Sequence, residues 1–118
     1  MWRLSVDKTF SAAHQLTKYN GPCENLHGHT WKIQIVVEGN KLDEAGMLMD
    51  FRVLKNQLQE LTDKFDHKFL NDLFKESPTS EFLSKHVFQL LKKTLPTAVT
   101  LKEVSIWESE SSKATYFE

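Results

Sequence analysis

Two stretches in the first third of the chain alternate apolar and polar residues, and this alternation constrains the fold more than any other feature. Over residues 2–14 most apolar side chains occupy even positions, and over residues 29–38 they occupy odd positions. Successive side chains of a strand point to opposite faces, so each stretch predicts a β-strand with one buried face. A loop of turn-forming residues, 18–22, lies between them, which favours an antiparallel pair.

Three histidines extend the apolar faces of these strands at the ends that the loop joins. His14 has the parity of the first apolar face, and His27 and His29 have that of the second. Residues two apart in an extended chain point to the same side, so His27 and His29 can reach one point in space. Gly28 between them allows close approach of a ligand or of backbone. Pairing of the two strands brings His14 to the same end.

Three converging imidazoles suit Zn²⁺, and three protein ligands leave a fourth position open, as in catalytic zinc sites. The alternative is a half-buried His14 beside two surface histidines, since His-x-His is a common sequence. The position of His14 on the apolar face favours the metal. We therefore predict a zinc site formed by His14, His27 and His29.

Cys23 is the only cysteine and lies four residues before His27. One cysteine cannot form an internal disulfide, which is typical of a reducing compartment. The thiol can be a fourth zinc ligand, a small buried side chain or a catalytic group activated by a neighbouring cation. The residues alone leave these three interpretations open.

Two further sites carry titratable groups. In Asp66-His67 a carboxylate can orient an imidazole as an acid or base, although the pair taken alone favours the simpler interpretation of a solvated helix end. Glu108 shares the parity of the apolar residues before it. A buried carboxylate requires a partner, so Glu108 either meets a ligand or side chain or lies in water beyond the strand. His86 receives no predicted role.

The remainder of the chain predicts two helices followed by two strands. Asp50 can cap a helix over residues 51–65, and Ser77 or Thr79 can cap a second helix that ends before Pro96. Strand character returns over residues 99–108 and 114–117. Strands and helices cluster separately, which predicts an α+β domain over residues 1–118, with two helices on one face of an antiparallel sheet.

Composition excludes several classes of partner. The net charge of −1 provides no global attraction for nucleic acid. The N-terminus lacks the apolar run of a signal peptide, and no stretch approaches the roughly 20 apolar residues of a membrane span. We expect a soluble cytoplasmic protein.

Six short blocks of sequence, taken together and in order, resemble the 6-pyruvoyl-tetrahydropterin synthase family over nearly the whole chain. They are Phe10-Ser11-Ala12-Ala13-His14, Cys23-x-x-x-His27-Gly28-His29, Met49-Asp50-Phe51, Asp66-His67-x-x-Leu70-Asn71, Pro78-Thr79-Ser80-Glu81 and the strand ending in Glu108. The interval of three residues between Cys23 and His27 is similar to that of the bacterial 6-carboxytetrahydropterin synthase (QueD) branch. Ser77 and Phe65 depart from the residues common in the family.

The resemblance implies a tunnelling fold (T-fold) with ββααββ order. Subunits of this fold join their sheets into a barrel, usually as two stacked trimers, so we expect a homohexamer with active sites between subunits. The resemblance also implies residue roles. It gives zinc ligands (His14, His27, His29), a catalytic thiol (Cys23), a relay pair often supplied by a neighbouring subunit (Asp66, His67), a carboxylate that binds the pterin and joins the relay (Glu108), and a segment near the pterin pocket (Thr79, Ser80).

The activity implied is conversion of 7,8-dihydroneopterin triphosphate to 6-carboxytetrahydropterin, with release of acetaldehyde and triphosphate, in queuosine biosynthesis. One alternative is a pyruvoyl synthase, which eliminates triphosphate and keeps the side chain. Another is a non-enzymatic zinc- or pterin-binding protein, against which the retained Cys23, Asp66 and His67 argue.

Overall fold

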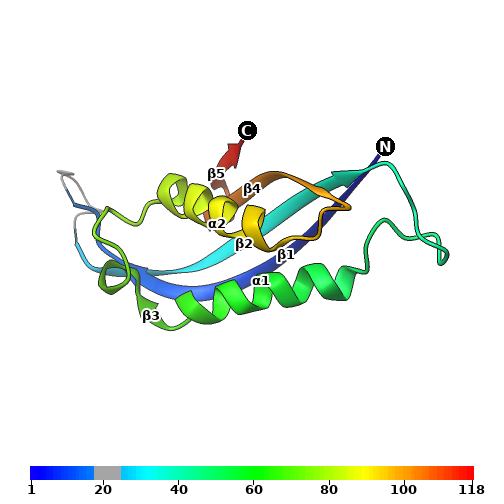
Figure 1. The fold of residues 1–118 in the computed structure, drawn as a ribbon. Helices are drawn as coiled ribbons and strands as arrows, with labels where there is room; N and C mark the ends of the chain where they lie inside the picture. Colours follow the sequence, from blue (N-terminus) through cyan, green and yellow to red (C-terminus); the bar gives the residue numbers. More distant parts are fainter. Residues whose placement is uncertain (18–24) are drawn as a thin grey trace.

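The computed structural model describes residues 1–17 and 25–118. Its longest elements are β1 (Trp2–His14) and β2 (His27–Gly39), which pair antiparallel over their whole length. The register runs from Trp2 opposite Gly39 to His14 opposite His27. The two strands form the long curved ribbon in Figure 1. Both predicted strands are confirmed, and β2 begins two residues earlier than expected.

The sheet has five strands in the order β3-β1-β2-β4-β5. β4 (Thr100–Ser109) pairs antiparallel with β2, and β5 (Ser112–Phe117) pairs antiparallel with β4. The predicted antiparallel sheet is confirmed for β1, β2, β4 and β5, and β3 (Lys68–Phe69) adds a short parallel pair with β1. A strand of two residues is too short to leave a periodic signal, so the sequence could not reveal it.

Two helices of equal length cover one face of the sheet, which we call the inner face (Figure 1). α1 (Phe51–Phe65) is capped by Asp50, whose side chain accepts from the Arg52 amide. α2 (Ser80–Thr94) is capped by Thr79, so of the two predicted caps Thr79 is used and Ser77 is not. A short 3₁₀ turn, η2 (Leu70–Asp72), follows β3. No helix in the described part of the chain is long and apolar enough to cross a membrane.

The core fills the space between the helices and the inner face. From the strands it contains Val6, Phe10, Ala12, Trp31, Ile33, Ile35, Val37, Val104 and Ile106, and from the helices Leu54, Leu58, Leu61, Phe65, Leu83, Val87, Phe88 and Leu91. The strand residues have the parity that the sequence predicted. His14, His27, His29 and Glu108 share this parity, so they lie where the apolar inner face ends.

Candidate metal centre

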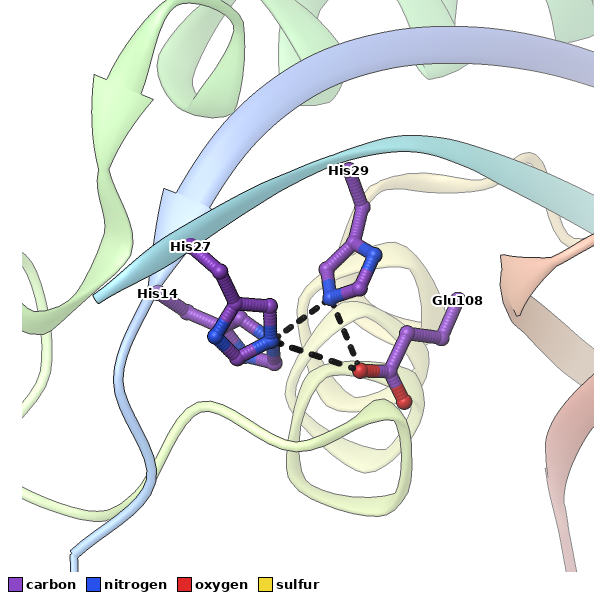
Figure 2. A group of neighbouring side chains, drawn as sticks. All are labelled: His14, His27, His29 and Glu108. Atoms are coloured by element: carbon purple, nitrogen blue, oxygen red, sulfur yellow. Dashed lines mark hydrogen bonds and ion pairs between the residues drawn. The ribbon is translucent and has the colours of Figure 1, made fainter. Parts of the chain in front are cut away.

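Three histidines meet at the end of the inner face, near the residues that join β1 to β2 (Figure 2). His14 pairs directly with His27 across the two strands, and His29 lies opposite Ala12. Nε2 of His14 is 3.0 Å from Nε2 of His27 and 3.1 Å from Nε2 of His29. The predicted convergence of the three imidazoles is therefore present in the structure.

Glu108 brings a carboxylate to the same point. Its Oε1 lies 2.9 Å from Nε2 of His29, 3.3 Å from Nε2 of His14 and 4.0 Å from Nε2 of His27. All four donor atoms lie within 4.8 Å of one another. Of the two interpretations that the sequence left open for Glu108, the structure supports the partnered one. Figure 2 shows one carboxylate oxygen facing the histidines and the other pointing away.

Backbone carbonyls fix the orientation of two of the rings. Nδ1 of His14 lies 2.8 Å from the carbonyl oxygen of Pro78, and Nδ1 of His27 lies 2.7 Å from that of Asn25. A carbonyl oxygen only accepts hydrogen bonds, so both Nδ1 atoms carry the proton and donate. Each Nε2 then presents a lone pair. The sequence contained no signal for these partners, because a backbone carbonyl has no residue-type signature.

This arrangement fits a bound metal ion. Two Nε2 lone pairs that face each other at 3.0 Å repel unless a cation lies between them. Tetrahedral Zn²⁺ with Zn–N bonds of about 2.0–2.1 Å would separate its ligand nitrogens by roughly 3.3–3.4 Å, close to the distances here. A zinc-bound histidine usually donates its other ring N–H to a carbonyl or carboxylate, as His14 and His27 do here. The donor set therefore suits a cation with a preference for imidazole.

Burial favours the neutral, metal-binding form of His29. His14 is 1% exposed, and the indole of Trp31 contacts the rings of both His14 and His29 edge-on, with centroids 4.9 and 5.3 Å away. Burial lowers the pKa of His29, and the neighbouring His14 and His27 lower it further, while Glu108 opposes them. A neutral imidazole is the form that binds metal.

The Asp66-His67 pair lies elsewhere. Oδ1 of Asp66 accepts a hydrogen bond of 2.9 Å from the Ser11 amide and lies 3.1 Å from Nδ1 of His67. The Ser11 hydrogen bond is the main cause that lowers the pKa of Asp66. His67 has a positive φ of 59°, and its side chain is 83% exposed beside an open cavity that Ser11, Gly28 and Thr30 also line. The two residues contact each other, but the described chain does not bring His67 into its own histidine cluster.

The remaining predicted site residues are placed as follows. Cys23 lies outside the described residues. Thr79 uses its hydroxyl to cap α2, accepting from the Phe82 amide. Ser80 is buried in the first turn of α2, and its Oγ has no hydrogen-bond partner among the described residues. Such a hydroxyl is unusual in a folded protein.

Comparison with known proteins agrees with these features. The family model described as 6-pyruvoyl tetrahydropterin synthase matches residues 3–118. The 6-carboxy-5,6,7,8-tetrahydropterin synthase of Synechocystis sp. is 40% identical over 99% of this chain and 94% of its own length. The dihydroneopterin monophosphate aldolase of Pyrococcus furiosus is 35% identical over 90% of this chain and 89% of its own.

A solved structure shows the same architecture. The 6-pyruvoyl tetrahydropterin synthase of Caenorhabditis elegans is 29% identical and superposes with a TM-score of 0.85, over 99% of this chain and 95% of that one. Its α+β tunnelling fold is the one observed here. The match to the family model over nearly the whole chain, with this fold and this cluster, shows that the chain belongs to the 6-pyruvoyl tetrahydropterin synthase family.

Proposed function

We propose that this protein is a zinc-dependent 6-carboxy-5,6,7,8-tetrahydropterin synthase. It converts 7,8-dihydroneopterin triphosphate to 6-carboxytetrahydropterin with release of acetaldehyde and triphosphate, in queuosine biosynthesis in the cytoplasm. The observation that carries this proposal is the convergence of three imidazole Nε2 atoms and one carboxylate at the end of the inner face. The relative from Synechocystis sp. that bears this activity in its name supports the choice within the family.

His14, His27 and His29 would hold the zinc ion. When bound, the ion would act as a Lewis acid toward the side-chain hydroxyls of the substrate. The residues supply its support. The Pro78 and Asn25 carbonyls keep two rings in the required tautomer, and the Trp31 indole excludes water from one side of the cluster.

Glu108 would bind the pterin through its outward-facing oxygen. The 2-amino-pyrimidinone edge of a pterin presents neighbouring N–H groups, which a carboxylate accepts well. Ser80 and Thr79 would complete this pocket, and the unpartnered Ser80 hydroxyl supports a role for this residue in hydrogen bonding to the substrate. The carboxylate also lies close enough to the imidazoles to take part in proton transfer.

Cys23 would move protons between the substrate side chain and the ring, and His67, oriented by Asp66, would reset it. The high exposure of His67, away from the histidine cluster of its own chain, supports delivery of this pair to the site of a neighbouring subunit. Its positive φ also supports a functional role, because non-glycine residues in this region are uncommon and concentrate at functional sites.

Assembly into a homohexamer would bring these parts together. Among the described residues β3 pairs only with Ala12 and Ala13 of β1, so from Trp2 to Phe10 the side of β1 that faces away from β2 has no strand beside it. β5 forms the other edge of the sheet. Unpaired edges of this kind can join sheets of separate subunits, which is what the proposed barrel requires.

Two related activities compete with this proposal. The Caenorhabditis elegans neighbour is a pyruvoyl synthase, and the Pyrococcus furiosus relative is named as an aldolase for dihydroneopterin monophosphate. A non-enzymatic zinc- or pterin-binding protein is the third alternative. The two enzymes differ from the carboxy synthase in the substrate they consume or the product they release, and the binding protein would release no product.

A product assay separates these activities. Zinc-loaded protein is incubated with dihydroneopterin triphosphate, and we expect acetaldehyde and a 6-carboxypterin product. A pyruvoyl product without acetaldehyde would reject the carboxy synthase, as would turnover of the monophosphate alone or binding without any product. We expect Cys23→Ala to retain zinc and to lose turnover by roughly 10²–10⁴-fold, as for loss of a proton-transfer group. Full activity of this variant would reject the thiol mechanism.

A further inference from the structure

The segment between α1 and α2, residues 66–79, hydrogen bonds along the end of β1. The His67 amide donates to the Ser11 carbonyl at 2.6 Å, and the Thr17 amide donates to Oγ of Ser77 at 2.9 Å. Together with β3 these contacts follow β1 toward the metal centre and past it. Residues 66–79 therefore do more than connect two helices, because they supply partners for backbone that would otherwise lie at a free sheet edge.

Asn71 makes the most complete of these contacts. Its Oδ1 accepts from the Gln15 amide at 2.9 Å, and its Nδ2 donates to the Gln15 carbonyl at 2.7 Å. One side-chain amide thus pairs both backbone groups of one residue, as a neighbouring strand would. Leu70, the preceding residue in η2, is fully buried and anchors this turn in the core.

The residue that Asn71 holds follows His14 directly. The ring of His14 is held by the carbonyl of Pro78, at the other end of the same segment. Residues 66–79 therefore fix His14 twice, once through its imidazole and once through the peptide after it. A shift of Gln15 would move the backbone of His14 and turn its Nε2 away from the other two imidazoles.

We propose that Asn71 is a positioning residue of the metal centre, which sets zinc affinity by fixing the Gln15 peptide and through it His14. This inference rests on the proposed function of the histidine cluster. The hydrogen bonds of the Asn71 side chain go to the Gln15 backbone, so its effect on the centre passes through backbone geometry. Partners one step removed from metal ligands typically change metal affinity or activity by about 10–100-fold when they are removed.

Zinc affinity is measured by competition with a chromogenic chelator, at a temperature where every metal-free variant is folded by circular dichroism. We expect Asn71→Ala to bind zinc about 10–100-fold more weakly than the wild type. Asn71→Asp, nearly identical in shape, loses the donor to the Gln15 carbonyl and is expected to weaken binding as well. Asn56 is an exposed residue of α1, so Asn56→Ala and Asn56→Asp serve as matched controls with unchanged affinity.

A second measurement uses the metal-free protein and does not depend on activity. We expect the Gln15 amide to exchange with solvent faster in the Asn71 variants than in the wild type, while amides in the centre of β2 keep their protection. If Asn71→Ala does not fold, Ser77→Ala tests the same segment through Thr17, with an expected weakening of a few-fold.

The outcomes separate the inference from the proposed function. Weakened zinc binding with faster Gln15 exchange supports the positioning role. Unchanged zinc affinity in both Asn71 variants, beside a wild type that binds one zinc per chain, would overturn the role of Asn71 and leave the metal centre intact. A wild type that binds no zinc would overturn the metal centre, and the inference with it.

Discussion

The middle of the inner face and its end are formed by residues of the same parity on the same strands. The middle forms the apolar core, and the end forms a polar cluster. In the middle, the side chains of Phe10, Trp31 and Ile33 are apolar and closed off by the helices. At the end, residues of the same parity in β1 and β2 are His14, His27 and His29, whose rings contact one another.

The two regions differ in how burial is made favourable. Apolar side chains gain free energy simply by leaving water, at roughly 25 cal/mol per Å². Imidazoles and a carboxylate lose solvation when they are buried, so they need defined partners. His14 has one such partner in the Pro78 carbonyl, and the proposed metal ion would be the partner of its Nε2. A strand can therefore carry a core and a ligand site on one face, provided that the site lies where partners can reach it.

The largest effect is expected when an imidazole is removed from the end of the inner face. We expect His27→Ala to lose zinc, because two imidazoles remain where the site requires three. Zinc content measured by mass spectrometry should fall from about one per chain to near zero. His86→Ala, which removes an imidazole outside the cluster, should keep its zinc. Unchanged zinc content in His27→Ala would remove His27 from the ligand set.

The second largest effect is expected when a large apolar side chain is removed from the middle of the inner face. Trp31 is fully buried, and its ring stacks on that of Phe10 with centroids 6.0 Å apart. We expect Trp31→Ala to lower the free energy of unfolding by about 3–5 kcal/mol, as measured by chemical denaturation of the metal-free protein. Trp2→Ala removes a half-exposed indole from the same sheet and should cost far less. Equal losses in the two variants would contradict the assignment of Trp31 to the core.

A third effect lies between the two regions, at the start of α2. The Thr79 hydroxyl accepts from the Phe82 amide at 3.0 Å, and Thr79 follows the residue whose carbonyl holds His14. We expect Thr79→Ala to lower the free energy of unfolding by about 1 kcal/mol, because a helix amide loses its partner. Thr79→Ser keeps the hydroxyl and should remain within a few tenths of the wild type. Denaturation that finds both variants equally weakened would argue against the cap.

The smallest effect concerns a histidine outside both regions. His86 packs against the rings of Phe74 and Phe82. Burial lowers its pKa below the usual 6.5, Lys64 lowers it further, and Glu76 opposes this. The unfolded chain then binds more protons than the folded one, so His86 weakens the fold as the pH falls from about 6.5 through the lowered pKa.

His86→Gln removes this contribution. We expect the metal-free variant to lose less stability than the wild type between pH 7 and pH 5, as measured by urea denaturation at several pH values. The difference between the two pH profiles isolates His86, because every other residue is the same in both proteins. Parallel pH profiles for wild type and variant would show that burial does not perturb His86.

Much of the fold could be predicted from local patterns. Alternation predicted β1 and β2, helical spacing predicted α1 and α2, and Asp50 supplied the expected cap. β3 escaped because two residues carry no period. The contacts between Asn71 and Gln15 also escaped, because a polar side chain 56 residues away in the sequence gives no local sign of the backbone it will meet.

The candidate site divides in the same way. Parity placed His14, His27 and His29 on the apolar faces of their strands and left Glu108 either partnered or in water, and the structure brings all four together. The residues left several interpretations open for Cys23 and for Asp66 with His67. Family resemblance favoured the catalytic thiol and its relay, and these roles remain predictions. The sequence motifs gave no sign that His67 lies away from the histidine cluster of its own chain.

By itself the sequence determined which stretches form the long strands and the two helices, and which face most residues of β1 and β2 occupy, since both follow from interactions within a few residues. The tertiary structure decided the register that sets His14 opposite His27, and the approach of Glu108 on β4. It also decided which carbonyls hold the imidazoles. These features depend on how separate segments pack together, and that free energy is shared over the whole core rather than encoded at any one position.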